Sequence, residues 1–208
     1  MSNAIRIFCI GRNYAEHIRE LGHAPGDPVI FMKPATSLVF SDTKELRLPA
    51  DGDLDYETEL VVEIGKEGKP ASEADVPSFL RALGVGFDLT HRKLQSHLLS
   101  NNFPWERCKA FDGSAPLGEL TPFDPAKDDL NHLTFTGSVN GKIRQTGNTA
   151  KMIYPISRLV LEISKDWKLL PGDLIYTGTP EGIGRLYDGD ILSAADHRGK
   201  TCSWTFRA

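Results

Sequence analysis

The chain has few cysteines, no excess of positive charge and no long apolar run. Its three cysteines, Cys9, Cys108 and Cys202, lie far apart and form no C-x-x-C pair, which disfavours both a disulfide framework and a zinc–thiolate site. Sparse, unpaired cysteines are typical of a reducing compartment, so we expect a cytoplasmic protein. The net charge of −4 gives no electrostatic reason to expect a nucleic-acid partner or an anionic membrane surface. No stretch approaches the roughly 20 apolar residues of a membrane-spanning helix.

Short strand-like runs, separated by glycine and proline, dominate what the chain does contain. Its 208 residues include 19 glycines and 13 prolines, and this length suits one domain, which we expect to cover residues 1–208. The runs IRIFCIG, VIFMKP, ELVVEIG, ALGVGFDLT, LTFTGSVNG, DLIYTGTP and DILSA are typical of strands. Asn140 and Gly141, between two such flanks, predict a hairpin turn.

Helical patterns are fewer than strand patterns. The spacing of apolar residues predicts helices over residues 13–21, 90–101 and 148–165, the last interrupted by Pro155. The balance of the two patterns predicts an α+β fold in which strands dominate.

The run LDYETELVVEIG, residues 54–65, places carboxylates where a strand enters the core. Because strand side chains alternate, Asp55, Glu57 and Glu59 share one face, and neighbouring carboxylates are about 6–7 Å apart along the strand. Asp88 ends a second predicted strand, GVGFDLT, and would add to the Glu57 and Glu59 pair. An oxygen-only set of this kind suits Mg²⁺, Mn²⁺ or Ca²⁺. The pattern equally allows solvated edge charges, with Asp88 capping the following helix.

Further groups could take part in chemistry. His17 and Glu20 are three residues apart on a predicted helix and share a face, where the carboxylate could orient the imidazole as a general base; a surface histidine beside a chance acid is the alternative. Lys109 could stabilise an oxyanion or a substrate carboxylate, or simply be solvated. The turn in PGDLIYTGTPEGIG, residues 171–184, could hold an anion through backbone N–H groups. The remaining histidines are interpreted as surface or structural residues.

Seven stretches occur in an order that resembles the fumarylacetoacetate hydrolase family, above all its small acylpyruvate hydrolase and oxaloacetate decarboxylase members. They are GRNYAEHIRELG, PVIFMKP, DYETELVVEIGK, GFDLTHRKLQ, KAFDGSAPLG, VNGKIRQTGNTAKMI and LLPGDLIYTGTPEGIG. Each is modest alone, but together they run from Ile7 to Leu192, nearly the whole chain. Glu63 departs from the pattern, because an apolar residue is expected there.

The resemblance implies a fold, a metal and an assembly. The fold would be a mixed β-roll, close to a β-barrel, of the type found in the C-terminal domain of that family. The metal would be Mg²⁺ or Mn²⁺, held by Glu57, Glu59 and Asp88. Members of the family are commonly homodimers, so we expect a homodimer here.

The resemblance also implies roles for residues around that metal. Lys109 matches the lysine beside the metal and the reacting carbonyl. His17 and Glu20 match a dyad that activates water, carried on an N-terminal strand and lid helix within residues 1–25. Residues that contact the substrate in the family match Arg92, Gln95 and Thr179.

Together these features suggest a metal-dependent hydrolase that cleaves a C–C bond in a β-diketo acid such as an acylpyruvate or fumarylpyruvate. The 2-oxoacid end would chelate the metal, His17 with Glu20 would deprotonate water, and Lys109 would stabilise the oxyanion. Oxaloacetate decarboxylation could use the same enolate. One alternative is a 2-hydroxy-dienedioate isomerase or oxaloacetate tautomerase. Another is an inactive metal-binding scaffold, against which the intact dyad and lysine argue.

Overall fold

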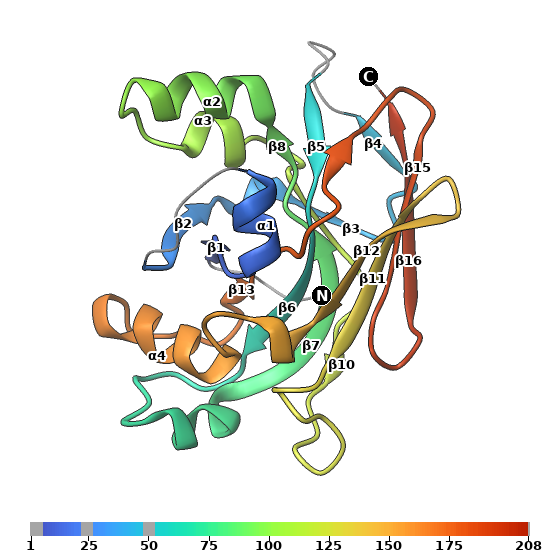
Figure 1. Cartoon of the computed structure of the whole chain (residues 1–208). Coiled ribbons are helices and arrows are strands. Elements are labelled where there is room, and N and C mark those ends of the chain that lie inside the picture. The colour runs from blue at the N-terminus through green and yellow to red at the C-terminus, as the bar shows by residue number, and fades with distance from the viewer. Residues whose placement is uncertain (1–5, 22–26, 48–52, 208) are drawn as a thin grey trace.

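A strongly curved, mixed β-sheet runs through the centre of the protein (Figure 1). The computed structural model describes residues 6–21, 27–47 and 53–207. In this part of the chain the sheet has eight strands, in the order β2-β1-β13-β6-β7-β9-β3, with β10 paired to β7. Their bounds are β1 (Ile7–Gly11), β2 (Val29–Lys33), β3 (Leu38–Phe40), β6 (Thr58–Ile64), β7 (Leu80–Phe87), β9 (Ala115–Leu117), β10 (Thr121–Pro122) and β13 (Leu174–Tyr176).

Two smaller sheets complete the strand framework of the described residues. A five-stranded sheet has the order β12-β11-β15-β16-β4, and a three-stranded sheet has the order β14-β5-β8. Their bounds are β4 (Glu45–Arg47), β5 (Leu54–Tyr56), β8 (Thr90–His91), β11 (Thr134–Val139), β12 (Lys142–Asn148), β14 (Gly184–Arg185), β15 (Ile191–Ala195) and β16 (Thr201–Arg207).

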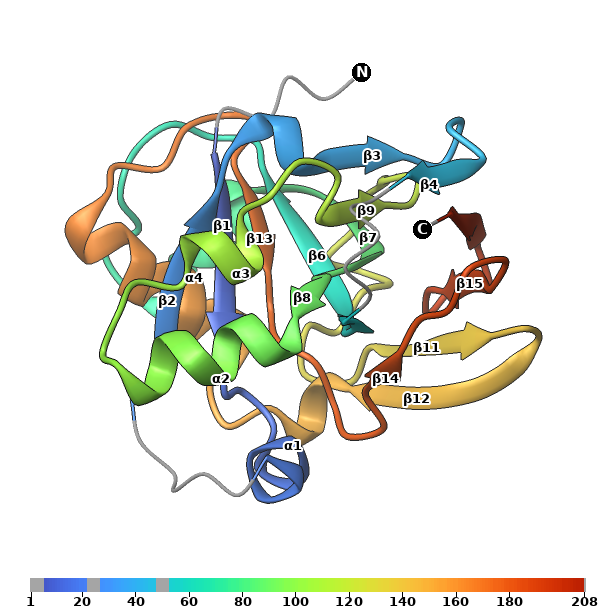
Figure 2. The ribbon, with the colours of Figure 1, turned by 90° about the horizontal axis from the view of Figure 1, so that it is seen from above.

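Short helices lie around these sheets. The α-helices are α1 (Ala15–Glu20), α2 (Arg92–Ser100), α3 (Glu106–Lys109) and α4 (Ile156–Asp166), and the 3₁₀ turns are η1 (Ala35–Ser37), η2 (Glu73–Phe79) and η3 (Thr149–Lys151). Helix α4 packs against η2, and α2 packs against α3 next to β8, as Figure 2 shows. No helix within the described ranges is long and apolar enough to cross a membrane.

The main apolar core joins the curved sheet, the five-stranded sheet and α4. Trp204 of β16 meets Phe87 of β7 edge-on, with ring centroids 6.0 Å apart. From the other end of the cluster, α4 contributes Leu159, Val160 and Ile163, all fully buried. Burial of such side chains is the main favourable term in folding. The predicted fold class, a strand-dominated α+β protein with a curled sheet, is therefore confirmed.

Turn-forming and helix-breaking residues account for several element boundaries. Asn140 and Gly141 both have positive φ, 52° and 74°, as a type I′ hairpin turn requires, so the predicted hairpin between β11 and β12 is confirmed. The predicted helix over residues 148–165 divides into η3 and α4, because Pro155 cannot continue a helix and instead precedes the first turn of α4.

The predicted strand over residues 54–65 is two strands, β5 and β6, which belong to different sheets. Glu57 lies between them, and its carbonyl accepts a 2.8 Å hydrogen bond from the backbone N–H of Asp88. Beyond this break β6 is buried along its whole length. Glu63, the residue that departs from the apolar pattern, is also buried, and its carboxylate pairs with Arg81 at 2.7 Å.

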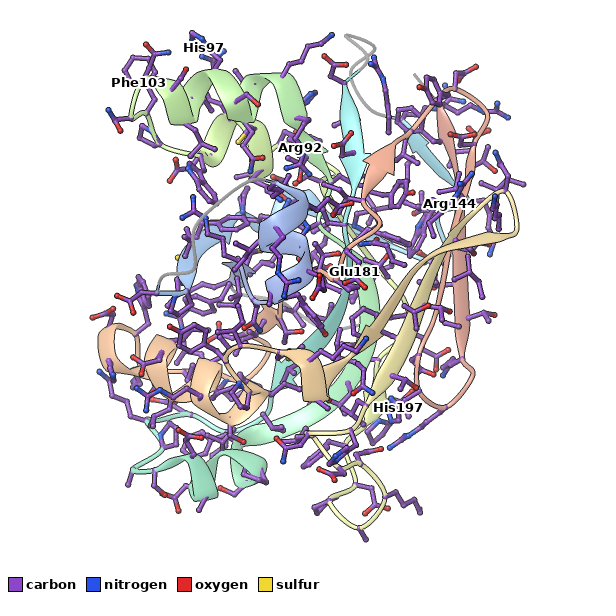
Figure 3. The ribbon with its side chains drawn as sticks, in the orientation of Figure 1. Arg92, His97, Phe103, Arg144, Glu181 and His197 are labelled. Atoms are coloured by element: carbon purple, nitrogen blue, oxygen red, sulfur yellow. The ribbon has the colours of Figure 1, made fainter. Side chains whose placement is uncertain are left out.

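A buried carboxylate ties the loop before β11 to the turn between β15 and β16. The Asp128 side chain is 1% exposed and lies 2.9 Å from Nε2 of His197, which Figure 3 places at that turn. It also accepts hydrogen bonds from Arg198 and from the backbone N–H of Asp124. Burial alone would raise the pKa of Asp128, but these hydrogen bonds outweigh burial and lower the pKa to about 2.

We predict that Asp128→Asn lowers the free energy of unfolding at pH 7 by about 1.5–3 kcal/mol, the usual range for hydrogen bonds to a charged group. Because the folded-state pKa is depressed, the wild-type advantage is full above the ordinary aspartate pKa and is lost as the pH falls towards 2. Urea unfolding at several pH values measures this. The control is Asp129→Asn in the same loop, whose side chain is 61% exposed. Equal losses for the two variants at pH 7 would contradict the prediction.

Candidate active site

Three carboxylates converge where the curved sheet meets the three-stranded sheet. Glu57 lies between β5 and β6, Glu59 lies on β6, and Asp88 follows β7 directly. The antiparallel register of β6 and β7 sets Glu59 opposite Gly86, and this brings the three side chains together. One oxygen from each lies within 4.8 Å of the others, and all three residues are buried. The alternative of solvated edge charges is therefore wrong.

Two buried lysines neutralise part of this charge. Lys109 Nζ donates to Glu57 Oε2 and to Asp88 Oδ2, at 2.7 Å each. Lys33, at the end of β2, places its Nζ 2.8 Å from Asp88 Oδ1 and 2.9 Å from Ser114 Oγ. The sequence interpretation gave Lys33 no role, although a lysine that ends the apolar run VIFMKP was an available signal.

The pKa values of Glu57 and Glu59 are shifted in opposite directions. Burial, together with the nearby charges of Asp88 and Glu57, raises the pKa of Glu59 well above its ordinary value. Burial would also raise the pKa of Glu57, but the charge of Lys109 helps to outweigh burial and lowers it. Like charges this close are stable together only with a compensating cation. Glu59 accepts a hydrogen bond from the backbone N–H of Gly178 at 2.8 Å.

The donor set fits a hard divalent cation. All the converging ligands are carboxylate oxygens, which Mg²⁺ and Mn²⁺ prefer to nitrogen or sulfur. Burial and the neighbouring carboxylates disfavour the charged form of Glu59 and raise its pKa, and a bound cation would favour the charged form. The residues present therefore fit a metal of the expected type.

Arg92, labelled in Figure 3, starts α2 and pairs with Glu57 of the carboxylate cluster. Its guanidinium donates to Asp55 Oδ2 at 2.8 Å, to Glu57 Oε1 at 2.5 Å and to Gln95 Oε1 at 2.6 Å. Burial would lower the pKa of Arg92, but Glu57 and Asp55 outweigh burial and raise it. Arg92 and Gln95 thus lie at the site as expected, and Arg92 is already paired twice.

Thr179 lies against the backbone of the carboxylate-bearing strand. Its hydroxyl donates to the Thr58 carbonyl at 2.9 Å and accepts from Gln145 Nε2 at 2.7 Å. Gln145 in turn accepts from the Thr58 N–H at 2.8 Å. Gln145 is buried and was not singled out from the sequence, where nothing distinguishes it from an ordinary hairpin residue. In the described structure these contacts fix the turn that carries Gly178.

The His17 and Glu20 pair forms on α1. His17 Nδ1 lies 3.3 Å from Glu20 Oε2, and the histidine side chain is only 6% exposed, so the alternative of a surface histidine is wrong. Glu20 Oε1 also accepts from the Gly182 N–H at 3.2 Å, which links α1 to the turn that follows β13. Gly182 has φ +95° and a Cβ there would lie 2.2 Å from the Arg144 carbonyl oxygen, so this close approach requires glycine.

One cavity, of about 30 Å³, brings some of these groups together, and Glu57 is the member of the carboxylate cluster that lines it. We call it the central cavity. It is lined by Gly11, Arg12, His17, Leu21, Phe31, Glu57, Arg92, Gln95, Leu99, Trp105 and Lys109. One part of the wall is therefore charged and the other apolar. Its volume is enough for about two water molecules, and it is partly open to solvent.

The other histidines that the structure describes lie outside the central cavity. His91 stacks on Phe111 with ring centroids 4.4 Å apart, and exposed His132 pairs with Asp129. His197 contacts Asp128, while His97 lies near the outer end of α2 (Figure 3). His23 lies outside the described residues.

The comparisons with known proteins agree with this geometry. Residues 6–201 match the family model "Fumarylacetoacetate (FAA) hydrolase C-terminal". The chain is 42% identical to the oxaloacetate tautomerase YcgM of Escherichia coli, over 90% of this chain and 86% of that protein. It is 35% identical to a mitochondrial oxaloacetate decarboxylase of Dictyostelium discoideum, over 90% of this chain and 86% of that protein.

A solved relative carries a metal and a 2-oxoacid. The fumarylpyruvate hydrolase of Pseudomonas aeruginosa, in complex with Mn²⁺ and pyruvate, superposes with a TM-score of 0.92 at 36% sequence identity. The match covers 98% of this chain and 90% of that one. Fold, motif order and sequence identity lead to the same assignment, and the chain belongs to the fumarylacetoacetate hydrolase family.

Proposed function

We propose that this protein is a metal-dependent enzyme that moves a proton between the keto and enol forms of a small 2-oxoacid, with oxaloacetate as the best candidate. The observation that carries the proposal is a buried histidine, paired with a carboxylate, in the wall of a small cavity that Glu57 of the metal-type carboxylate cluster also lines. The names of the relatives support it, because two of them act on oxaloacetate.

Glu57, Glu59 and Asp88 would hold Mg²⁺ or Mn²⁺. Bound there, the cation supplies Lewis-acid polarisation of the 2-oxo group and a fixed template for its carboxylate. The structures of relatives support a metal of this type, because one contains Mn²⁺ together with pyruvate.

His17 is the group that would move the proton at carbon 3 of the substrate. Ionised Glu20 is an acceptor only, so the 3.3 Å contact makes His17 Nδ1 the donor. The other ring nitrogen, Nε2, then has a lone pair, which accepts the proton from carbon 3 in the keto-to-enol direction while the oxygen on carbon 2 takes a proton from solvent. In the reverse direction Nε2–H delivers the proton to carbon 3 and the enol O–H releases its proton to solvent. Because His17 is buried beside the cavity, bulk water competes little for that proton.

Lys109 would stabilise negative charge on the substrate oxygen as the carbon 3 proton leaves. Burial alone would lower the pKa of Lys109, but Asp88 and Glu57 outweigh burial and raise it, so the ammonium persists at neutral pH. A fixed ammonium next to a developing enolate oxygen lowers the barrier without reorganisation. Arg92 and Gln95 are proposed to orient the substrate, and Thr179 to keep the carboxylate-bearing strand in place.

Hydrolysis of a C–C bond in an acylpyruvate or fumarylpyruvate is the second candidate. The His17 and Glu20 pair supports it, since the same base could deprotonate water, and a fumarylpyruvate hydrolase is among the similar structures. The names of two relatives, an oxaloacetate tautomerase and an oxaloacetate decarboxylase, favour the smaller substrate. An inactive scaffold is the weakest candidate, because the dyad and Lys109 are intact.

The function is tested by following the absorbance of enol-oxaloacetate as it converts to the keto form. We predict that the Mn²⁺-loaded protein accelerates this conversion above the buffer rate, that EDTA removes the acceleration, and that Mn²⁺ or Mg²⁺ restores it. Release of CO₂ and cleavage of acylpyruvates are measured in parallel. Faster acylpyruvate cleavage than ketonisation, compared as kcat/KM, would replace the tautomerase proposal with the hydrolase.

His17→Gln tests the proton-transfer role. We predict a fall in kcat of about 10²–10⁴-fold, the usual contribution of a positioned general base, with unchanged Mn²⁺ affinity because His17 is not a proposed ligand. His132→Gln, an exposed histidine beside Asp129, is the control and should keep wild-type rates. Wild-type kcat in His17→Gln would exclude the assigned base.

We also propose a cytoplasmic homodimer, as the family resemblance implies. A second apolar cluster on the curved sheet supports a dimer contact, because Phe31, Leu38, Phe40 and Leu120 at its margin are only partly buried. Isologous contacts commonly cover such surfaces. Light scattering should give twice the chain mass of 23.0 kDa, and a monomer at all concentrations would contradict the proposal.

A further inference from the structure

Arg12 lines the central cavity and has no proposed role so far. It follows β1 directly, is half-buried, and shares the cavity with His17, Arg92 and Lys109. Its φ of 65° lies in the left-handed region, which a bulky side chain seldom adopts. Such conformations persist where surrounding contacts enforce them, and they cluster at ligand sites.

The contacts that enforce this conformation come from the next residue. Asn13 is fully buried, and its amide donates to the Tyr154 carbonyl at 3.1 Å and the Thr177 carbonyl at 2.8 Å. Its side-chain oxygen accepts from the Tyr154 N–H at 2.8 Å. Asn13 thus fixes the turn after β1 on both sides, and this holds Arg12 at the cavity wall.

Arg12 differs from the other cations of the cavity in its lack of a partner. Lys109 is paired with Glu57 and Asp88, and Arg92 is paired with Asp55 and Glu57. Among the residues that the structure describes, no carboxylate or other hydrogen-bond acceptor contacts the Arg12 guanidinium. A guanidinium has five N–H donors and stays charged, so Arg12 is free to bind an anion that enters the cavity.

The apolar part of the wall limits where a second anionic group could bind. Leu21, Phe31, Leu99 and Trp105 line the cavity together with Arg12. A carboxylate placed against these side chains would lose its hydration without gaining a hydrogen bond or an ion pair. Next to Arg12 it gains a charge-assisted and often bidentate contact.

We infer that Arg12 binds the second carboxylate of the substrate and makes the site selective for 2-oxo dicarboxylic acids over 2-oxo monocarboxylic acids. The inference rests on the proposed function for the 2-oxo end of the substrate, and it adds the group that recognises the other end. Arg12 is a specificity-determining residue in this account, and it takes no part in proton transfer.

Binding of malate and lactate to the Mn²⁺-loaded protein tests this inference without any turnover. The two 2-hydroxy acids differ by one carboxylate, as oxaloacetate differs from pyruvate. Calorimetry should show that the wild-type protein binds malate at least about tenfold more tightly than lactate, in line with the usual strength of a charge-assisted contact. Arg12→Gln should reduce the preference to near unity by weakening malate alone. Arg12→Lys should keep part of it.

Arg19→Gln is the matched control. Arg19 is on α1, close to Arg12 in sequence, but its side chain is 70% exposed and pairs with Glu16, so this variant should keep the wild-type preference. Gln and Arg both carry a Cβ, so Arg12→Gln does not change the steric cost of a φ of 65° at this position. Thermal unfolding of the variant checks that the fold is intact.

Two results would overturn the inference. One is a wild-type protein that binds malate no better than lactate. The other is a folded Arg12→Gln variant that keeps the preference or loses both ligands equally. The inference and the proposed function can fail separately. If the protein prefers malate through Arg12 but does not ketonise oxaloacetate, the role of Arg12 stands and the tautomerase proposal is wrong.

Discussion

Buried like charges are the constraint on which this structure depends. Glu57, Glu59 and Asp88 bring three carboxylates within 4.8 Å in the interior of the sheet, where removing a single unpaired charge from water is costly. Lys33 and Lys109 reduce that cost from two sides. The raised pKa of Glu59, caused by burial and by its two acidic neighbours, shows that the lysines do not offset it completely. A divalent cation in this position would complete the balance and create a binding site for a 2-oxoacid at the same time.

The fold supplies rigid supports for this cluster from distant parts of the chain. The register of β6 and β7 fixes two of the carboxylates, and β2 brings Lys33 beside Asp88. Gly178, just after β13, donates its N–H to Glu59. Groups held on strands and strand ends move little, which suits electrostatic stabilisation of a developing enolate. The His17 and Glu20 pair is instead on the short helix α1, linked to the turn after β13 through Gly182.

The sequence predicted the parts of the site that local periodicity and motif order can reveal. Alternation along a strand placed Glu57 and Glu59 on one side, and the spacing of His17 and Glu20 placed them together on a helix. Pairings across long stretches of sequence were not predictable in the same way. Lys33 meets Asp88 and Gln145 meets Thr58 only because non-neighbouring strands pack together. The division of the 54–65 strand at Glu57 was also missed, because nothing in the alternation marks the change of sheet.

The same limit applies to the charges of the cavity. From the sequence, Arg92 and Lys109 were the candidates to bind an anionic substrate, yet the structure pairs both with carboxylates of the chain. Arg12 appeared ordinary in the sequence, and only its positive φ and its lack of a partner among the described residues single it out. Substrate selectivity is thus inferred from the three-dimensional arrangement, whereas the metal cluster was inferred from the sequence.

The binding of oxalate with and without metal tests the central claim most directly. Oxalate is a flat analogue of an enolised 2-oxoacid, and two adjacent oxygens would form a chelate ring on a hard cation. Calorimetry should detect oxalate binding to the Mn²⁺-loaded protein and none after EDTA, with binding restored when Mn²⁺ is returned. Equal affinity before and after EDTA would mean that the carboxylate cluster does not bind substrate through a cation, and would contradict the account.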